Sequence, residues 1–327
     1  MHYQFRAQLR QTGIRVKHRN RYFNVTAAPA EAGYSAVAAA FHVTAALEEN
    51  HRMSEPTLQA QIDAARAYEA LFVPALFGQW APVVADAAHV RPGQRVLDVG
   101  CGTGVLAREI ASRIGSEGRV AGIDPNPGMV AVAQQLSSLV DWREGVAESL
   151  PFPEHSFDAV VSQFALVFFA DRRQALLEML RVLTPGGRLA VAVWDSLDNI
   201  PAYAAEVALL ERMAGRQAAD ALRAPFALGN LKDLAALFSE AGVATADITT
   251  HHGTAQFPGI RTMVEADLRG WLPVMGVVLA EDLVDRILQE AGQALASCAT
   301  SDGRIAFDVS AQIVTVTKPQ HVAGGTV

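Results

Sequence analysis

Short apolar runs alternate with longer amphipathic stretches over the middle of the chain, between residues 95 and 194. A continuous run such as Ala159-Val160-Val161 is typical of a strand covered on both faces of a sheet. Apolar residues that recur every three or four positions predict helices instead. Strands that alternate with helices imply crossovers and a parallel sheet. The predicted strands cover 95–99, 119–124, 141–144, 157–164 and 188–194, and the predicted helices cover 105–114, 129–139 and 175–183.

Looser patterns lie on either side of this alternation. Residues 54–89 are helical in pattern, with breaks expected at Pro74 and Pro82. Together the elements predict an α/β fold, with a doubly wound, seven-stranded, mostly parallel sheet, helices on both faces and a helical cap. Beyond residue 194 the pattern predicts helices at 202–213, 231–241 and 261–296, the last interrupted by Pro273, and strands at 243–251 and 305–318.

The same patterns divide the chain into five parts. Residues 1–52 are rich in arginine and lack periodicity, whereas Met53 and Ser54 begin a segment with a helix N-cap. We interpret residues 1–52 as a leader outside the fold, either a targeting peptide or a disordered or artefactual extension upstream of the natural start. The other parts are N-terminal helices over the binding site (53–92), an α/β core with a helical insertion near 200–225 (93–256), a helical cap insertion (257–300) and a last strand with a tail (301–327).

Composition and charge narrow the class of partner. The chain of 327 residues has a formal net charge of −7 at pH 7, which argues against a phosphate backbone as partner, so we expect no nucleic acid. Cys101 and Cys298 lie far apart and fit neither a disulfide framework nor a metal site, which favours a reducing compartment, the cytoplasm. The sequence has no run of about 18 apolar residues, so we expect no membrane span, and we expect no metal.

The candidate chemistry centres on residues 96–104, where a predicted strand runs through a glycine-rich turn into a helix. Gly100, Gly102 and Gly104 allow a sharp turn and let a ligand approach the free N–H groups of the helix. Asp98 would repel a pyrophosphate but can hold an ammonium group. Asp124, at the tip of the second strand, can accept hydrogen bonds from both hydroxyls of a ribose. The pattern therefore favours a nucleoside ligand with a zwitterionic amino-acid tail over a dinucleotide.

These residues resemble motif I of the class I S-adenosylmethionine-dependent methyltransferases, which have a Rossmann-like fold. Similar segments follow in the order typical of that family: 122–129 at the second strand, 144–152 on the adenine side, 157–162 in the fourth strand and 183–189 at the turn into the fifth. The resemblance covers residues 90–195, about a third of the chain. It is strongest to the broad group that includes the ubiquinone and menaquinone biosynthesis methyltransferases, a group that methylates carbon, nitrogen and oxygen atoms.

The resemblance implies S-adenosylmethionine as the cofactor. Asp98 would hold its ammonium group and Asp124 its ribose, while Met129 would cover one face of the adenine. Cys101 suits the turn by its small size, and no His or Lys nearby in sequence would activate it as a nucleophile. The residues expected to bind the cofactor are Asp98, Gly100, Cys101, Gly102, Thr103, Gly104, Asp124, Pro125, Met129, Ala147, Glu148 and Gln163.

The expected acceptor pocket follows from the chemistry of this cofactor. Because the sulfonium already activates the methyl group, the chain has mainly to align a nucleophile in line with it and exclude water. A general base is needed only for an acceptor such as a phenol, and the candidates are Asp195, His251 and His252. The apolar bias indicates a small, largely apolar acceptor methylated on O, N or C. The segment 271–275 is either a pocket wall or a homodimer interface. The expected pocket residues are Tyr68, Phe72, Phe77, Trp80, Phe164, Trp194 and Trp271.

Three other functions stay open. An NAD-dependent oxidoreductase shares the glycine turn and the strand-tip acid, but Asp98 and Val105 depart from the dinucleotide pattern. A non-catalytic regulatory protein that binds S-adenosylmethionine would have the same motifs, because methyl transfer needs no fixed catalytic triad. Aminopropyl transfer from a related sulfonium would need further acids, which the sequence does not place beside Gln163.

Overall fold

The chain separates into two compact units, Met1–Ser54 and Glu55–Val327. In the first unit, β1 (Ile14–His18) and β2 (Arg21–Val25) pair as antiparallel strands. The sequence analysis did not predict these strands, and the rest of the predicted leader lies outside the described residues. The structure is a computed structural model that describes residues 14–18, 21–25, 57–243 and 245–320.

The second unit is built on a seven-stranded sheet with the strand order β5-β4-β3-β6-β7-β9-β8. Strands β3 to β7 are parallel, whereas β9 runs antiparallel to both of its neighbours. The chain winds outward in both directions from β3 and β6, which confirms the doubly wound α/β fold. The strands are β3 (Arg95–Val99), β4 (Arg119–Asp124), β5 (Val140–Glu144), β6 (Phe157–Gln163), β7 (Leu183–Trp194), β8 (Asp247–Phe257) and β9 (Ile305–Thr317).

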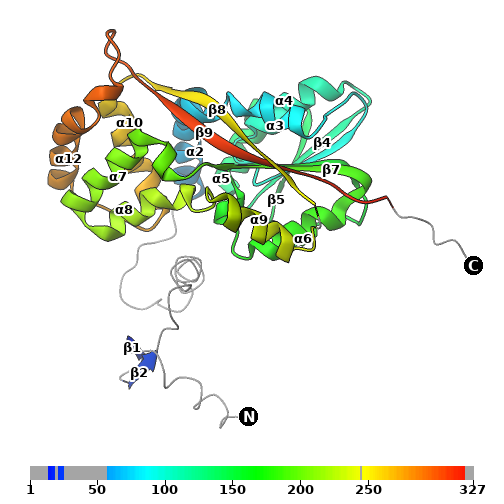
Figure 1. Cartoon of the computed structure of the whole chain (residues 1–327), viewed down its shortest axis with the longest axis horizontal. Helices are drawn as coiled ribbons and strands as arrows, with labels where there is room; N and C mark the ends of the chain where they lie inside the picture. The colour runs from blue at the N-terminus through cyan, green and yellow to red at the C-terminus, as the bar shows by residue number, and fades with distance from the viewer. Residues whose placement is uncertain (1–13, 19–20, 26–56, 244, 321–327) are drawn as a thin grey trace, which may run out of the picture. The chain divides into compact units, whose positions relative to one another are not determined.

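Two apolar layers cover opposite faces of the sheet, because successive strand residues point to opposite sides. Val96 belongs to the core formed with α3 and α4, and its neighbour Leu97 belongs to the core formed with α6 and α9. Figure 1 shows these two pairs of helices on the two sides of the sheet. The helices of the core are α3 (Trp80–Ala87), α4 (Val105–Ile114), α5 (Pro127–Leu136), α6 (Arg172–Val182) and α9 (Leu231–Glu240).

The helical cap is made from two segments that lie far apart in the sequence. One follows β7, and the other lies between β8 and β9. Because α7 packs against α12 and α8 packs against α11, both segments form one layer at one end of the sheet (Figure 1). The insertion predicted near 200–225 therefore packs with the cap predicted over 257–300. The cap elements are α7 (Pro201–Ala214), α8 (Arg216–Arg223), η5 (Ala224–Phe226), α10 (Ile260–Ala266), η6 (Asp267–Trp271), α11 (Leu272–Val274) and α12 (Glu281–Ala294).

The N-terminal helical segment is broken at Pro74, as predicted, but not at Pro82, which lies in the first turn of α3. Helix α2 (Leu58–Phe72) passes at Val73 into a short π-helical turn, η2 (Val73–Phe77), which contains Pro74. Thr57 caps the start of α2, since its Oγ1 accepts a hydrogen bond from the Ala60 N–H at 3.3 Å. The remaining short elements are η3 (Leu166–Phe168), η4 (Leu197–Asn199) and η7 (Ala296–Cys298).

Two predicted strands differ from the structure by more than one residue at a boundary. The segment 184–187, predicted as a turn, belongs to β7, because Gly186 N–H donates to Lys318 O and Lys318 N–H donates to Gly187 O, both at 2.9 Å. The strand predicted at 243–251 is β8 at Asp247–Phe257. Its buried residues, Ala255 and Phe257, lie at its far end, so the apolar pattern misplaced it.

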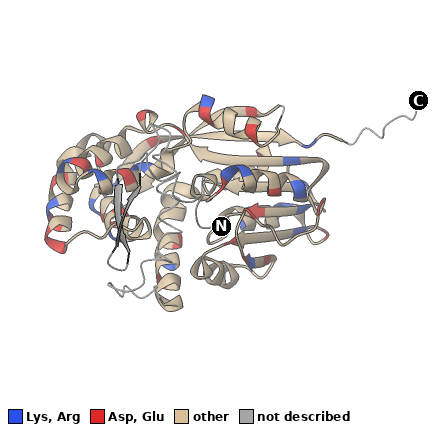
Figure 2. Ribbon diagram, turned by 90° about the horizontal axis from the view of Figure 1, so that it is seen from below, with Lys and Arg blue, Asp and Glu red and all other residues tan. Residues whose placement is uncertain are grey.

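Charged residues of both signs are distributed over the same helices and strands (Figure 2). Over the described part of the chain, no single helix is long and apolar enough to cross a membrane. The segments Leu58–Phe77 and Trp80–Ala87 meet the length and composition criteria only as a pair, with a bend of 67° between them.

Candidate cofactor and acceptor site

The glycine-rich turn lies at the carboxyl end of β3, where the strand order reverses and such sheets bind ligands. Gly100, Gly102 and Gly104 all have positive φ angles, of 71°, 54° and 88°. The turn is tied to the neighbouring strand, because Gly100 and Cys101 both donate their N–H to the Ile123 carbonyl, at 2.8 and 3.0 Å.

The three glycines have different neighbours. A Cβ on Gly100 would come within 2.3 Å of the Ala165 Cβ, and a Cβ on Gly104 would come within 2.1 Å of the Trp142 ring. A Cβ on Gly102 would meet no protein atom within 4 Å. Packing therefore accounts for glycine at two of the positions, and Gly102 is the one that borders open space.

Asp124 holds the turn from the tip of β4. Its Oδ2 accepts the Gly102 N–H and its Oδ1 accepts the Asn126 N–H, both at 2.9 Å. Asn126 in turn caps α5 by accepting the N–H groups of Gly128 and Met129. Burial raises the pKa of the Asp124 carboxyl, although the two amides partly oppose this shift. Each oxygen keeps a lone pair for a further donor, as two ribose hydroxyls require.

Asp98 lies in β3, two residues before Gly100, and is buried, with 1 % of its surface exposed. Neither of its oxygens makes a hydrogen bond of ordinary geometry to the described residues. Burial raises the pKa of Asp98 to about 8; the Ala107 N–H at the start of α4 lowers it somewhat, and the charge of Asp124 raises it. An unpaired buried carboxylate is unfavourable, so this position suits a ligand that brings a cation.

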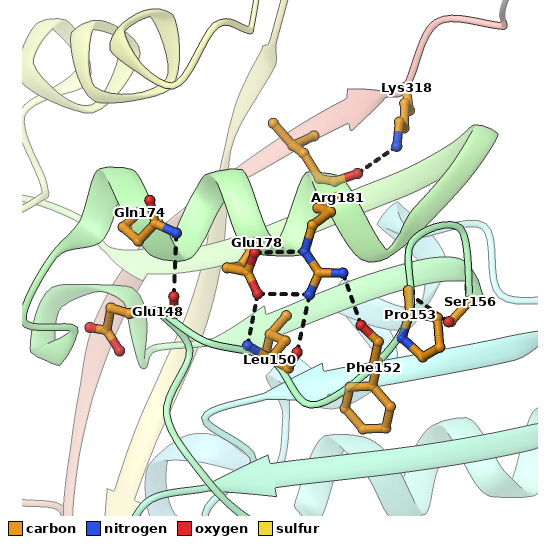
Figure 3. A network of polar contacts seen from close by, with 10 residues as sticks. Glu148, Leu150, Phe152, Pro153, Ser156, Gln174, Glu178, Arg181 and Lys318 are labelled. Carbon is orange, nitrogen blue, oxygen red and sulfur yellow. Dashed lines mark hydrogen bonds and ion pairs between the residues drawn. The ribbon is translucent and has the colours of Figure 1, made fainter.

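The loop on the adenine side is fixed by an ion pair on α6, between Glu178 and Arg181 at 2.6 Å (Figure 3). Glu178 accepts the Leu150 N–H at 2.8 Å, while Arg181 donates to the carbonyls of Leu150 and Phe152, at 3.1 and 2.9 Å. Sequence analysis missed this pair, because its partners are main-chain atoms that no side-chain pattern reveals.

Helix α2 lies over the turn and is joined to it by a second missed ion pair. Glu69 contacts Arg108 of α4 at 2.6 Å, and Arg108 also donates to the Thr103 carbonyl at 2.5 Å. The close approach of α2 to α5 needs Gly128, where a Cβ would come within 2.4 Å of the Gln61 main chain. Helix α2 is therefore packed directly against the helices that follow β3 and β4.

An aromatic cavity of about 610 Å³, including the space at its mouth, lies between α2, the strand ends and the cap. Phe164, just beyond β6, adopts a left-handed conformation with a φ of 59° and stacks on Trp194 at 3.8 Å. A bulky residue in this region is strained, and such strain occurs mostly at functional sites. Next to it, Gln163 donates to the Phe77 carbonyl at 3.2 Å.

The cavity brings together most of the aromatic residues that the sequence analysis selected. Trp80 is the exception, since it is buried behind the wall and packs edge-on against Phe164 and Trp194. The selected residues on the cavity wall are Tyr68, Phe72, Phe77, Phe164, Trp194 and Trp271. The wall residues that the analysis missed include Phe168, Tyr203, Phe226 and Asp267.

The family described as "Methyltransferase domain" matches residues 97–191, which hold the turn, both acids and the adenine-side loop. Residues 97–191 are therefore similar to a methyltransferase domain. A ubiquinone/menaquinone biosynthesis C-methyltransferase UbiE of Ectopseudomonas mendocina is 41% identical over 126 residues, 37% of this chain and 49% of that protein. A 2-phytyl-1,4-naphtoquinone methyltransferase of Thermosynechococcus vestitus is 37% identical over 115 residues, 34% of this chain and 51% of that protein.

The chain thus spans about half the length of the curated relatives it matches. Solved structures share the fold over a larger part. The YcgJ protein of Bacillus subtilis matches with a TM-score of 0.50 and 22% identity, over 74% of this chain and 99% of that one. A phosphoethanolamine N-methyltransferase 2 of Haemonchus contortus matches with a TM-score of 0.50 and 19% identity, over 80% of this chain and 58% of that one.

The other predicted cofactor residues differ in burial. Cys101, Thr103 and Ala147 are buried, Met129 is half-buried and Pro125 is exposed. Burial raises the pKa of the Cys101 thiol well above its ordinary value, so this cysteine is not an activated nucleophile. The Glu148 carboxylate accepts the Asp171 N–H at 3.2 Å, so its Oε1 already contacts the start of α6.

The three candidate bases do not line the aromatic cavity. Asp195 and His252 line a separate polar pocket, and His251 lies 3.0 Å from the Thr249 hydroxyl. Asp195 accepts hydrogen bonds from Ser310 and Asn199. Burial raises the pKa of Asp195, but its hydrogen bonds outweigh burial and hold the pKa below its ordinary value. No three described His, Cys, Asp or Glu side chains are grouped so as to hold a metal.

Proposed function

We propose that this protein transfers a methyl group from S-adenosylmethionine to a small, largely apolar molecule by in-line displacement. The observation that carries the proposal is the buried carboxyl of Asp98, which has no ordinary hydrogen-bond partner among the described residues and precedes a glycine turn that borders open space at Gly102. Such a group matches the ammonium of an amino-acid tail and would repel a pyrophosphate. This charge pattern favours the methyl donor over a dinucleotide.

Different residues would bind different parts of the cofactor. Asp98 would receive the ammonium, and Asp124 would accept the ribose hydroxyls with the lone pairs that Gly102 and Asn126 leave free. Met129, Ala147 and Glu148 would border the adenine. When bound, S-adenosylmethionine supplies a methyl group that its sulfonium already activates for displacement. The chain's own contribution is then alignment and the exclusion of water.

The aromatic cavity is the proposed site of the acceptor. It begins at Phe164, directly after the predicted methyl-side residue Gln163, and its walls are almost entirely apolar. The curated relatives are named as methyltransferases of ubiquinone, menaquinone and a phytyl naphtoquinone, which supports an apolar acceptor here. The atom methylated stays open between C, N and O. Absence of nucleic-acid partners, a homodimer and a cytoplasmic location stay predictions.

The test is calorimetric titration of the full chain with S-adenosylmethionine, with its demethylated product and with NADH. We expect both sulfur compounds to bind and NADH not to bind. Asp98→Asn should weaken binding of the methyl donor by about tenfold or more, because a charge-assisted contact is lost. Asp158→Asn is the matched control, since this acid pairs with Arg95 at the opposite end of the sheet.

Two outcomes would replace the proposal by one of its alternatives. Binding of NADH without binding of either sulfur compound would indicate an oxidoreductase. Binding of the methyl donor without transfer of a labelled methyl group to any component of a small-molecule extract would indicate a regulatory protein.

A further inference from the structure

Two acids are buried inside the helical cap, away from the methyltransferase turn. Asp267, at the start of η6, is 3 % exposed, and Glu206, in the middle of α7, is 0 % exposed. Asp267 lines the aromatic cavity. Every other described residue on the cavity wall is aromatic or aliphatic, so this carboxyl is an isolated acidic group in a largely apolar pocket.

The two carboxyls have no basic partner among the cavity residues and interact with each other instead. Burial raises the pKa of Asp267 to about 8, and burial together with the charge of Asp267 raises the pKa of Glu206 well above its ordinary value. Asp267 Oδ2 and both oxygens of Glu206 make no ordinary hydrogen bond to a described residue. Buried polar groups are normally paired, so the cavity presents an acceptor that no described side chain satisfies.

Aromatic rings connect this acid pair with the methyl side of the cavity. Phe164 stacks on Trp194, whose ring centroid lies 6.5 Å from that of Phe226, and Phe226 lies 5.3 Å from Tyr203. Burial raises the pKa of Tyr203, and the nearby charges of Asp267 and Glu206 raise it further. The acids therefore lie near Tyr203, and Phe164 is at the other end of this row of rings.

A protonated amine fits this end of the cavity better than a neutral group does. It supplies both N–H donors for Asp267 and the positive charge that a buried carboxylate needs. Aromatic faces also attract a desolvated cation. An alcohol could donate a hydrogen bond, but it would bring no positive charge to stabilise the ionised form of this buried carboxyl.

We propose that the acceptor carries a protonated amine, which Asp267 binds at the end of the cavity opposite Phe164 while Glu206 positions the Asp267 carboxylate. The proposal rests on the proposed function only in treating the occupant of the cavity as the methyl acceptor. Asp267 is then a specificity-determining residue, and Glu206 is a positioning residue that acts through it.

Calorimetry with 3-phenylpropylamine and its isosteric alcohol, 3-phenylpropan-1-ol, tests the proposal on the full chain saturated with S-adenosylhomocysteine. We expect the amine to bind about tenfold more tightly than the alcohol. Asp267→Asn should weaken amine binding by about tenfold and alcohol binding by less than about threefold, since only the amine forms an ion pair. Glu206→Gln should cause a smaller loss, again confined to the amine.

Asp282→Asn is the matched control, because Asp282 is an exposed acid on α12 of the same cap. Equal binding of amine and alcohol by the unaltered protein overturns the proposal, as does the absence of amine binding or its persistence in Asp267→Asn. Should that variant not fold, the comparison of amine with alcohol on the unaltered protein decides. Repeating the titration without S-adenosylhomocysteine separates the proposals: Asp267-dependent amine binding by a protein that ignores the methyl donor would refute only the proposed methyl transfer.

Discussion

The sheet and the cap each bury a pair of acids, and the two pairs are stabilised differently. In the sheet, Asp124 accepts two main-chain N–H groups, because a strand end and a turn leave such donors unpaired. In the cap, Glu206 lies in the middle of a helix, where the N–H groups are used within the helix itself. Asp124 is thus held by the backbone, whereas the cap pair, like Asp98, has few such donors and depends on its own members or on a ligand.

This difference separates what the fold provides from what the individual protein adds. A carboxylate at a strand tip beside a glycine turn lies within the part of the chain that matches the methyltransferase domain. Its proposed role in binding the cofactor does not depend on which acceptor is methylated. An acid inside an inserted helical layer has no such general role. We infer that the seven-stranded sheet with its turn, the sheet half, binds the methyl donor. The helical cap, the cap half, selects the acceptor. Four predictions test this division.

The largest expected effect is on folding, at the turn of the sheet half. Gly104→Ala should lower the free energy of unfolding by about 2–4 kcal/mol, because the added methyl group meets the Trp142 ring and the φ of 88° is strained for alanine. Urea unfolding measures this loss.

Gly102→Ala is the matched variant, with the same type of φ but open space around its Cβ. It should lose only about 1 kcal/mol of stability from backbone strain. It should also weaken binding of S-adenosylmethionine by about tenfold or more, equivalent to roughly 1.4 kcal/mol. If the two variants lost equal stability, the distinction between a packing glycine and a ligand-facing glycine would be wrong.

The sheet half could be predicted from sequence because its determinants are local. The helix 105–114 and the strands 95–99 and 119–124 agree with the structure residue by residue. Buried parallel strands are short apolar runs, and the glycines and acids stand at their ends, so the order of motifs also fixes which residues meet.

The cap could be predicted only as helical. Glu206 and Asp267 are separated by 61 positions (267 − 206) and lie on different insertions, so no spacing in the sequence brings them together. For the same reason the search for a base selected Asp195 and the two histidines near strand ends, whereas the acid that lines the cavity lies in a helix. The ion pair of Glu178 with Arg181 escaped prediction because it binds main-chain atoms.

The second prediction compares one acid from each pair by its effect on binding of the methyl donor. Asp124→Asn should weaken binding of S-adenosylmethionine by about 10- to 100-fold, since a charge-assisted hydrogen bond contributes roughly 1.5–3 kcal/mol. Asp267→Asn should change the same affinity by less than about threefold, because Asp267 belongs to the cap. Calorimetry measures both affinities. Equal losses would mean that the two halves do not bind their ligands separately.

The third prediction is a decline in stability as pH rises from 5 to 7.5. The pKa of Asp98 is about 8 in the folded protein and about 3.9 when unfolded, so the folded state binds more protons between these values. Stability is therefore greatest at the acid side of this window and falls towards pH 8, by at most about 1.4 kcal/mol per pH unit for one such group. Asp267 acts in the same direction.

Asp98→Asn removes one of these groups, so its unfolding free energy, measured in urea at several pH values, should depend less on pH. Asp267→Asn should flatten the profile in the same way. A profile that rose between pH 5 and 7.5 in the unaltered protein would show that neither acid holds its proton in the folded state.

The smallest effect is expected where α2 joins the two halves. Tyr68 of α2 lines the cavity, and the next residue, Glu69, pairs with Arg108 above the methyltransferase turn. Glu69→Gln should lower the unfolding free energy by about 0.5–1 kcal/mol, because the pair is partly shielded from water and Arg108 keeps its bond to Thr103. Asp63→Asn, which breaks a more exposed pair on the same helix, should cost less in a parallel urea titration. A Glu69→Gln loss as large as that of Gly104→Ala would mean that α2 is part of the folding core of the sheet half. The position of the cavity wall formed by α2 would then depend on the sheet half and would not depend on the cap.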